Sequence, residues 1–128
     1  MIVDTSALIA IMRHEPEREL FLAAFEQGNA KMSAVTYFEF GIVADAARDV
    51  EVSAAVDEWV GVLNLNIVPV DQTAAAQARS AYAQFGKGRH PAQLNFGDCF
   101  AYALARETGE PLLFKGNDFA QTDIISAV

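Results

Sequence analysis

Four acidic residues in this sequence occupy positions where a folded chain must find a partner for their charge. Each one follows an apolar run or lies near the start of a helical segment, and they are Asp4, Glu39, Asp98 and Asp118. Burying an unpaired carboxylate is costly, and several carboxylates close together raise one another's pKa unless a cation neutralises them. The pattern therefore predicts a divalent metal ion held among these four side chains.

The type of ligand limits which metal ions fit the site and which chemistry they can support. Carboxylate oxygens, without histidine or cysteine in the set, suit hard ions such as Mg²⁺ or Mn²⁺ and disfavour structural zinc. Magnesium keeps several of its waters when it binds to protein, and such a water can be activated for attack on a phosphodiester. The four acids therefore predict metal-dependent hydrolysis of a nucleic acid backbone, with all four as metal ligands.

Short apolar runs alternate with helical patterns along the whole chain and bring the acids together. We expect strands over residues 1–3, 31–35, 67–70 and 111–114, with a last short strand at 124–125. We expect helices over residues 7–12, 16–27, 36–47, 52–65, 71–85 and 97–106. Because the strands are apolar without alternation, the pattern favours a three-layer α/β/α sandwich around a mostly parallel sheet of about five strands. The 128 residues are the size of one domain, 1–128, and ligands of such sheets gather at the carboxyl ends of the strands.

Each acid also has a purely structural interpretation. Asp4 and Asp98 could cap helices, and Asp118 could be an ordinary turn residue. Glu39 fits this interpretation less well, because it lies among aromatic and aliphatic residues where a structural glutamate needs a buried partner. The joint pattern, more than any single residue, carries the prediction of a metal site.

Polar and basic residues near the acids are candidates for supporting roles. Thr5 and Ser6 could hydrogen-bond a carboxylate or a metal-bound water, although either could equally cap a helix. The loop 86–91 is rich in glycine and positive charge. The candidate contacts to RNA phosphates are Lys87, Arg89, His90 and Lys115, whose charges could also be simply solvated.

Composition limits the location of the chain and raises one objection. The single cysteine, Cys99, agrees with a reducing compartment, and no apolar run predicts a signal peptide or a membrane span, so we expect a cytoplasmic protein. The net charge of −8 speaks against nucleic acid, since phosphate-binding proteins are usually basic. Setting the four candidate ligands aside halves that charge, and bound dications would change the local sign.

Taken together, the motifs resemble those of the VapC toxins of bacterial toxin–antitoxin pairs. The resemblance extends over the whole chain and is carried by the segments 1–7, 88–91, 94–103 and 112–119 and by the helix containing Glu39. It implies a PIN fold, Mg²⁺- or Mn²⁺-dependent cleavage of RNA, and a homodimer. It also implies a cognate VapB-type antitoxin whose C-terminal segment occupies the active-site groove, in a larger complex.

The resemblance maps the family's acidic positions onto residues of this chain. Asp4 and Asp98 match most directly, followed by Glu39 and then Asp118. Asn117 stands where relatives can carry a further aspartate, which makes it a candidate support and Asp118 the least secure ligand. An acidic toxin also suits an antitoxin segment that brings arginine or lysine into the cluster.

Three other functions share some of these features. A phosphoacceptor receiver domain has the same size and an acidic Mg²⁺ site, but it needs adjacent acids after the first strand, and Asp4 stands alone. A phosphatase of the haloacid-dehalogenase type needs an aspartate two residues after Asp4, where the chain has Ser6. A catalytically silent module that binds a basic partner remains open, because its function would not depend on metal.

Overall fold

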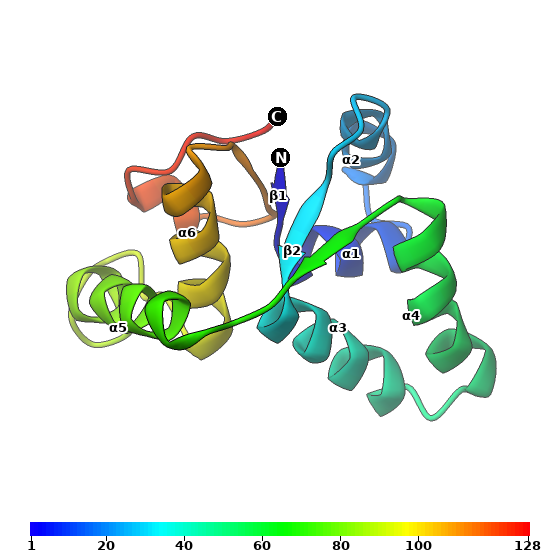
Figure 1. Cartoon of the computed structure of the whole chain (residues 1–128). Coiled ribbons are helices and arrows are strands. Elements are labelled where there is room, and N and C mark those ends of the chain that lie inside the picture. The colour runs from blue at the N-terminus through cyan, green and yellow to red at the C-terminus, as the bar shows by residue number, and fades with distance from the viewer.

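Short strands and helices alternate along the chain, and the computed structural model describes all residues from 1 to 128 (Figure 1). The strands are β1 (Ile2–Val3), β2 (Lys31–Ser33), β3 (Asn66–Val68) and β4 (Leu112–Leu113). The helices are α1 (Thr5–Met12), α2 (Arg18–Phe25), α3 (Ala34–Ala46), α4 (Val50–Val62), α5 (Gln72–Phe85) and α6 (Phe96–Thr108), with a 3₁₀ turn at Phe119–Gln121. The predicted helices and the first four predicted strands are present, with boundaries shifted by a few residues.

The four strands form one parallel sheet in the order β3-β2-β1-β4. The prediction of a parallel sheet is confirmed, but the expected fifth strand at 124–125 is absent. The C-terminal segment follows β4 only briefly: the Leu112 N–H donates to the Ile125 carbonyl, and the Ala127 N–H donates to the Leu112 carbonyl, both at 2.9 Å. These two bonds around a single bridge between Leu112 and Ser126 are too few to make a strand.

Helices cover both faces of the sheet, as the predicted three-layer sandwich requires. Helices α5 and α6 pack on one face, and helices α1 to α4 pack on the other (Figure 1). Successive residues of each short strand belong to opposite cores: Ile2 and Leu112 to the first, Val3 and Leu113 to the second. All four side chains are fully buried, so β1 and β4 form the centre of the hydrophobic core.

Polar caps fix where the helices begin and end. Asp71 accepts a hydrogen bond from the Ala74 N–H at 2.8 Å and starts α5, as the sequence predicted. Gly109 ends α6 with a φ of 67°, a conformation that glycine adopts without strain. Ser33 caps α3, which therefore begins at Ala34 rather than at residue 36. None of the helices combines the length and hydrophobicity needed to cross a bilayer.

Candidate metal centre

Asp4 lies between β1 and α1, at the carboxyl end of a central strand. Its side chain is only 4% exposed and caps α1: Oδ2 accepts hydrogen bonds from the Ser6 N–H at 2.9 Å and from Ser6 Oγ at 2.6 Å. The Ser6 hydroxyl oxygen in turn accepts a hydrogen bond from the Lys115 N–H at 3.0 Å. Ser6 therefore connects Asp4 to the loop after β4, which carries Asp118.

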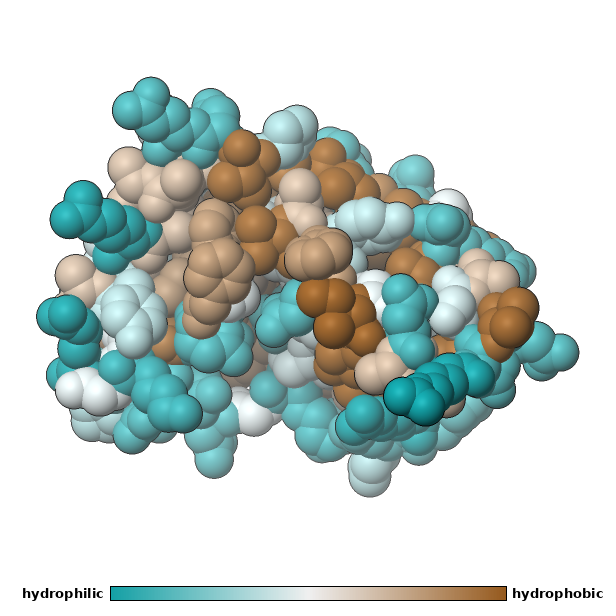
Figure 2. Space-filling view, turned by 90° about the horizontal axis from the view of Figure 1, so that it is seen from below, coloured by the Kyte–Doolittle hydropathy of each residue, from teal (hydrophilic) through white to brown (hydrophobic).

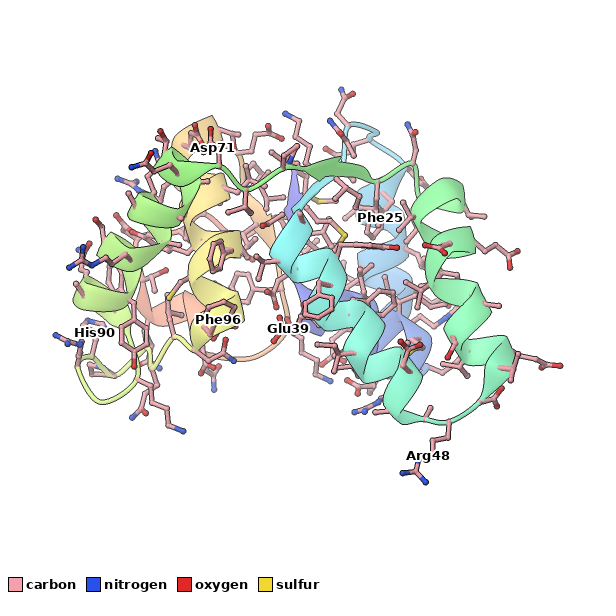
Figure 3. All side chains as sticks on the ribbon, turned by 60° about the horizontal axis from the view of Figure 1, so that its bottom comes forward. Phe25, Glu39, Arg48, Asp71, His90 and Phe96 are labelled. Carbon is pink, nitrogen blue, oxygen red and sulfur yellow. The ribbon has the colours of Figure 1, made fainter.

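Glu39 reaches the same region from α3. Thr5 Oγ1 donates a hydrogen bond to Glu39 Oε2 at 2.8 Å, so the hydroxyl next to Asp4 holds the second carboxylate. Figure 3 shows Glu39 directed from α3 toward the N-terminal end of α6, where Phe96 is labelled. The carboxylate lies against Gly97, where an added Cβ would be 2.8 Å from both Cδ and Oε1 of Glu39. The absence of a side chain at Gly97 makes room for this carboxylate.

Asp98 lies in the first turn of α6 and forms a capping box with Asn95. Asp98 Oδ2 accepts a hydrogen bond from the Asn95 N–H at 2.8 Å, and Asn95 Oδ1 accepts one from the Asp98 N–H at 2.9 Å. The structural interpretation is thus correct for Asp4, which is the N-cap of α1, and in part for Asp98, which supports the N-cap residue Asn95 from inside the first turn of α6. A cap does not preclude metal binding, because the Asp98 cap involves only Oδ2.

The charges of the acids act on one another. Burial, with a further contribution from the charge of Glu39, raises the pKa of Asp4, and the hydrogen bonds from Ser6 oppose that rise. Burial also raises the pKa of Asp98 to about 6, with added contributions from the charges of Asp4, Glu39 and Asp118. The two central aspartates therefore ionise at a cost, which a nearby cation would remove.

Asp118 and Asn117 lie at the exposed edge of this region. Both are solvent-exposed, and the Asn117 side chain forms no hydrogen bond, while its backbone carbonyl accepts one from Gln121. As the side chains stand, no three or more histidine, cysteine, aspartate or glutamate residues are placed to hold an ion together. The donor set nevertheless fits a hard dication, because it offers only oxygen atoms and carries mutual repulsion that two positive charges would relieve.

The candidate phosphate contacts differ from one another. The Lys115 ammonium group forms ion pairs with Glu15 and with Glu17, the latter at 2.9 Å, so its charge is already compensated. His90 is used locally, since its Nδ1 accepts a hydrogen bond from the Ala92 N–H at 3.1 Å. Lys87 and Arg89 are exposed and form no ion pair with an acid.

The sequence that places these acids at the carboxyl edge of a parallel sheet matches a known protein family. The sequence pattern of the family described as PIN domain matches residues 1–125. The chain belongs to the PIN-domain family. This match favours the nuclease prediction over the receiver and dehalogenase alternatives.

Among PIN domains, the chain belongs to the VapC ribonucleases, the toxins of toxin–antitoxin systems. It is 48% identical to VapC ribonuclease Mb0625 of Mycobacterium bovis and to ribonuclease VapC28 of Mycobacterium tuberculosis, covering 100% of this chain and 98% of each relative. It is 44% identical to ribonuclease VapC of Mycolicibacterium smegmatis, covering 97% of both chains. The resemblance found in the sequence is therefore confirmed.

Solved structures share the PIN fold at low sequence identity. The crystal structure of Mycobacterium tuberculosis VapC20, described as a sarcin-ricin loop cleaving toxin, superposes with a TM-score of 0.78 at 14% identity, covering 97% of this chain and 95% of that one. A toxin–antitoxin complex from Klebsiella pneumoniae gives a TM-score of 0.74 at 18% identity, covering 99% and 97%. These likenesses confirm the predicted fold class.

Two residues that contact the candidate ligands were not among the predicted site residues. Asn95 completes the capping box of Asp98, and its position three residues before an aspartate at a helix start was a readable signal. Gly97 makes room for Glu39, and a glycine inside the first turn of a helix, where it costs stability, was the available hint. What that glycine contacts could be seen only in the fold.

Proposed function

We propose that this chain, acting as a single PIN domain over 1–128, is a Mg²⁺- or Mn²⁺-dependent endoribonuclease. Asp4, Glu39, Asp98 and Asp118 would hold the metal. One observation carries the proposal: Glu39 is held by Thr5, next to Asp4, and lies against Gly97, next to Asp98, and the charges of the other acids help burial to raise the pKa of Asp98. Four acids from distant parts of the chain thus share one electrostatic environment, and carboxylates gathered in this way suit a dication.

The chain's own residues orient these ligands. Ser6 fixes Asp4, Thr5 fixes Glu39, and Asn95 fixes Asp98, each through a hydrogen bond of 2.9 Å or less. Asp118 is exposed and lies where it can approach an ion from the solvent side. A bound dication supplies the activation of a water for attack on the phosphodiester and the stabilisation of charge on the leaving oxygen.

Metal-dependent cleavage tests this proposal directly. The purified chain is incubated with total bacterial RNA in Mg²⁺, in Mn²⁺ or in EDTA, and the ends of the products are mapped by sequencing. We expect discrete cuts with either metal and none in EDTA, followed by recovery when Mg²⁺ is restored. Equal cleavage in EDTA would contradict metal dependence, whereas RNA left intact under all conditions would favour the silent binding module.

The partners follow from the same acidic centre. We propose a cytoplasmic homodimer that binds a VapB-type antitoxin, with a basic segment of the antitoxin placed among the carboxylates in a larger complex. Two of the solved PIN structures that resemble this chain are a toxin–antitoxin complex and FitAcB of Neisseria gonorrhoeae. Sedimentation with and without the basic peptide tests the assembly. A monomer, or a peptide that binds an Asp98→Asn variant as tightly as wild type, would contradict it.

A further inference from the structure

A pocket opens between α5 and the start of α6. We call it the α5–α6 groove, and its volume is about 560 Å³, within the range of ligand sites. Its lining includes Arg79, Tyr82, Lys87, Asn95, Phe96 and Phe100. Figure 2 shows hydrophobic side chains across the middle of the molecule seen from below, with hydrophilic ones between them and around the margin.

Aromatic rings form one wall of the groove and remain open to solvent. Phe96 is 72% exposed, although it stands at the start of a largely buried helix, and its ring lies 5.3 Å from that of Phe100 between centroids. Tyr82 contributes a second exposed ring from α5. Exposed aromatic rings of this kind offer a stacking surface to any flat ligand.

The rim of the groove gathers the positive charge that the protein leaves uncompensated. Four of the nine lysine and arginine side chains form ion pairs with acids: Arg18, Lys31, Arg106 and Lys115. Of the five others, Arg79 and Lys87 line the groove, and the Arg89 guanidinium lies 5.9 Å from the centre of the Tyr82 ring. In a chain with a net charge of −8, this clustering is complementary to a polyanion.

The groove leads directly to the candidate metal centre. Asn95 lines the groove, and its backbone N–H donates the hydrogen bond that holds Asp98. Phe96 and Asp98 stand two residues apart at the start of the same helix. A chain that lay in the groove would therefore reach the carboxylates within a short distance.

We propose that the α5–α6 groove binds an unpaired nucleotide of the RNA next to the phosphodiester that is cut. The base stacks on Phe96, with Tyr82 as a second platform, and Lys87 and Arg89 contact the adjoining phosphates. This inference rests on the proposed ribonuclease function and assigns its substrate-binding subsite. Because stacking reads a base only weakly, the groove selects unpaired RNA over duplex RNA more than one base over another.

Binding of a fluorescent RNA tests the groove without relying on cleavage. The full-length chain carrying Asp98→Asn, in Mg²⁺, is titrated with a single-stranded 12-nucleotide RNA that contains 2-aminopurine. Adding Phe96→Ala should weaken binding about 10-fold and remove the quenching caused by stacking, whereas Phe96→Trp should retain both. Phe38→Ala is the matched control, because Phe38 is an aromatic residue of similar exposure, 67%, on α3.

The cations are tested in the same titration at several salt concentrations. Arg89→Gln should lower the salt dependence of binding by about one ion, and Arg48→Gln, which removes an unpaired cation from the turn after α3, should leave it unchanged. If Phe96→Ala binds RNA and quenches fluorescence like Phe38→Ala, the proposal that the groove binds RNA is wrong. It is also wrong if Phe96→Ala changes the oligomeric state but leaves the RNA affinity unchanged. Quenching by wild type in Mg²⁺ without any cleavage would contradict the ribonuclease proposal and leave the groove standing.

Discussion

Asp98→Asn should abolish RNA cleavage and toxicity while leaving the fold intact. The substitution removes one negative charge from the group of four acids, and asparagine can still accept the capping hydrogen bond from the Asn95 N–H. Loss of several kcal/mol of transition-state stabilisation corresponds to a fall in cleavage rate of about 10³-fold or more. Growth on induction and sequencing of the cleaved RNA ends measure the effect. Asp45→Asn, an exposed aspartate on α3 without a side-chain hydrogen bond, is the matched control.

The same variant has an opposite effect on stability, which separates its electrostatic role from simple damage. The pKa of Asp98 is raised from an ordinary 3.8 to about 6 in the folded protein, so ionisation of Asp98 destabilises the metal-free protein as pH rises through that window. In EDTA at pH 7, Asp98→Asn should therefore melt at a higher temperature than wild type, and the difference should vanish near pH 4. Mg²⁺ should stabilise wild type more than the variant. Retained toxicity, or a variant that melts lower at pH 7, would contradict the assignment.

Local signals in the sequence were sufficient to place most of the framework. A polar residue before an alanine-rich run located the start of α5 at Asp71, whereas α1 begins two residues before the predicted residue 7 and α6 ends two residues after the predicted residue 106. The sheet edge was less predictable. The C-terminal segment is apolar enough to suggest a strand, but it meets β4 only around Leu112, and pairing between segments depends on the final packing.

The candidate site, like the fold, was predictable from local signals but not in its contacts between distant residues. Residue types predicted which acids matter, because an apolar neighbourhood makes a carboxylate conspicuous wherever it stands in the chain. Contacts between distant residues were not predictable. From the sequence, Lys115 was a candidate contact to RNA phosphates, but in the fold its charge is compensated by ion pairs with Glu15 and Glu17. The space that Gly97 leaves for Glu39 is of the same kind, since no spacing rule relates those two positions.

Gly97→Ala should impair cleavage without impairing the fold. Gly97 has an ordinary helical φ, and alanine stabilises a helix by up to about 1 kcal/mol relative to glycine, so the variant should melt no lower than wild type. The new Cβ would meet Glu39 Oε2 first and would lie 2.8 Å from Cδ and Oε1, where ordinary contact begins at 3.4 Å, so the flexible end of Glu39 would have to give way. A ligand displaced by about 1 Å can cost about 10²-fold in rate. Gly61→Ala, in α4 with open space around it, is the matched control.

Glu39→Asp should show whether Gly97→Ala slows cleavage because its methyl group crowds the Glu39 side chain. Glu39→Asp alone withdraws the carboxylate by one methylene and should slow cleavage, because the ligand no longer reaches its place beside Thr5. Combined with Gly97→Ala, the shorter side chain avoids the added methyl group, so the double variant should cleave faster than Gly97→Ala alone. Mn²⁺ affinity, measured by calorimetry on the four proteins, should follow the same order as the cleavage rates. If the two substitutions instead reduce cleavage independently, the methyl group does not act through Glu39, and Gly97 serves α6 rather than the metal centre.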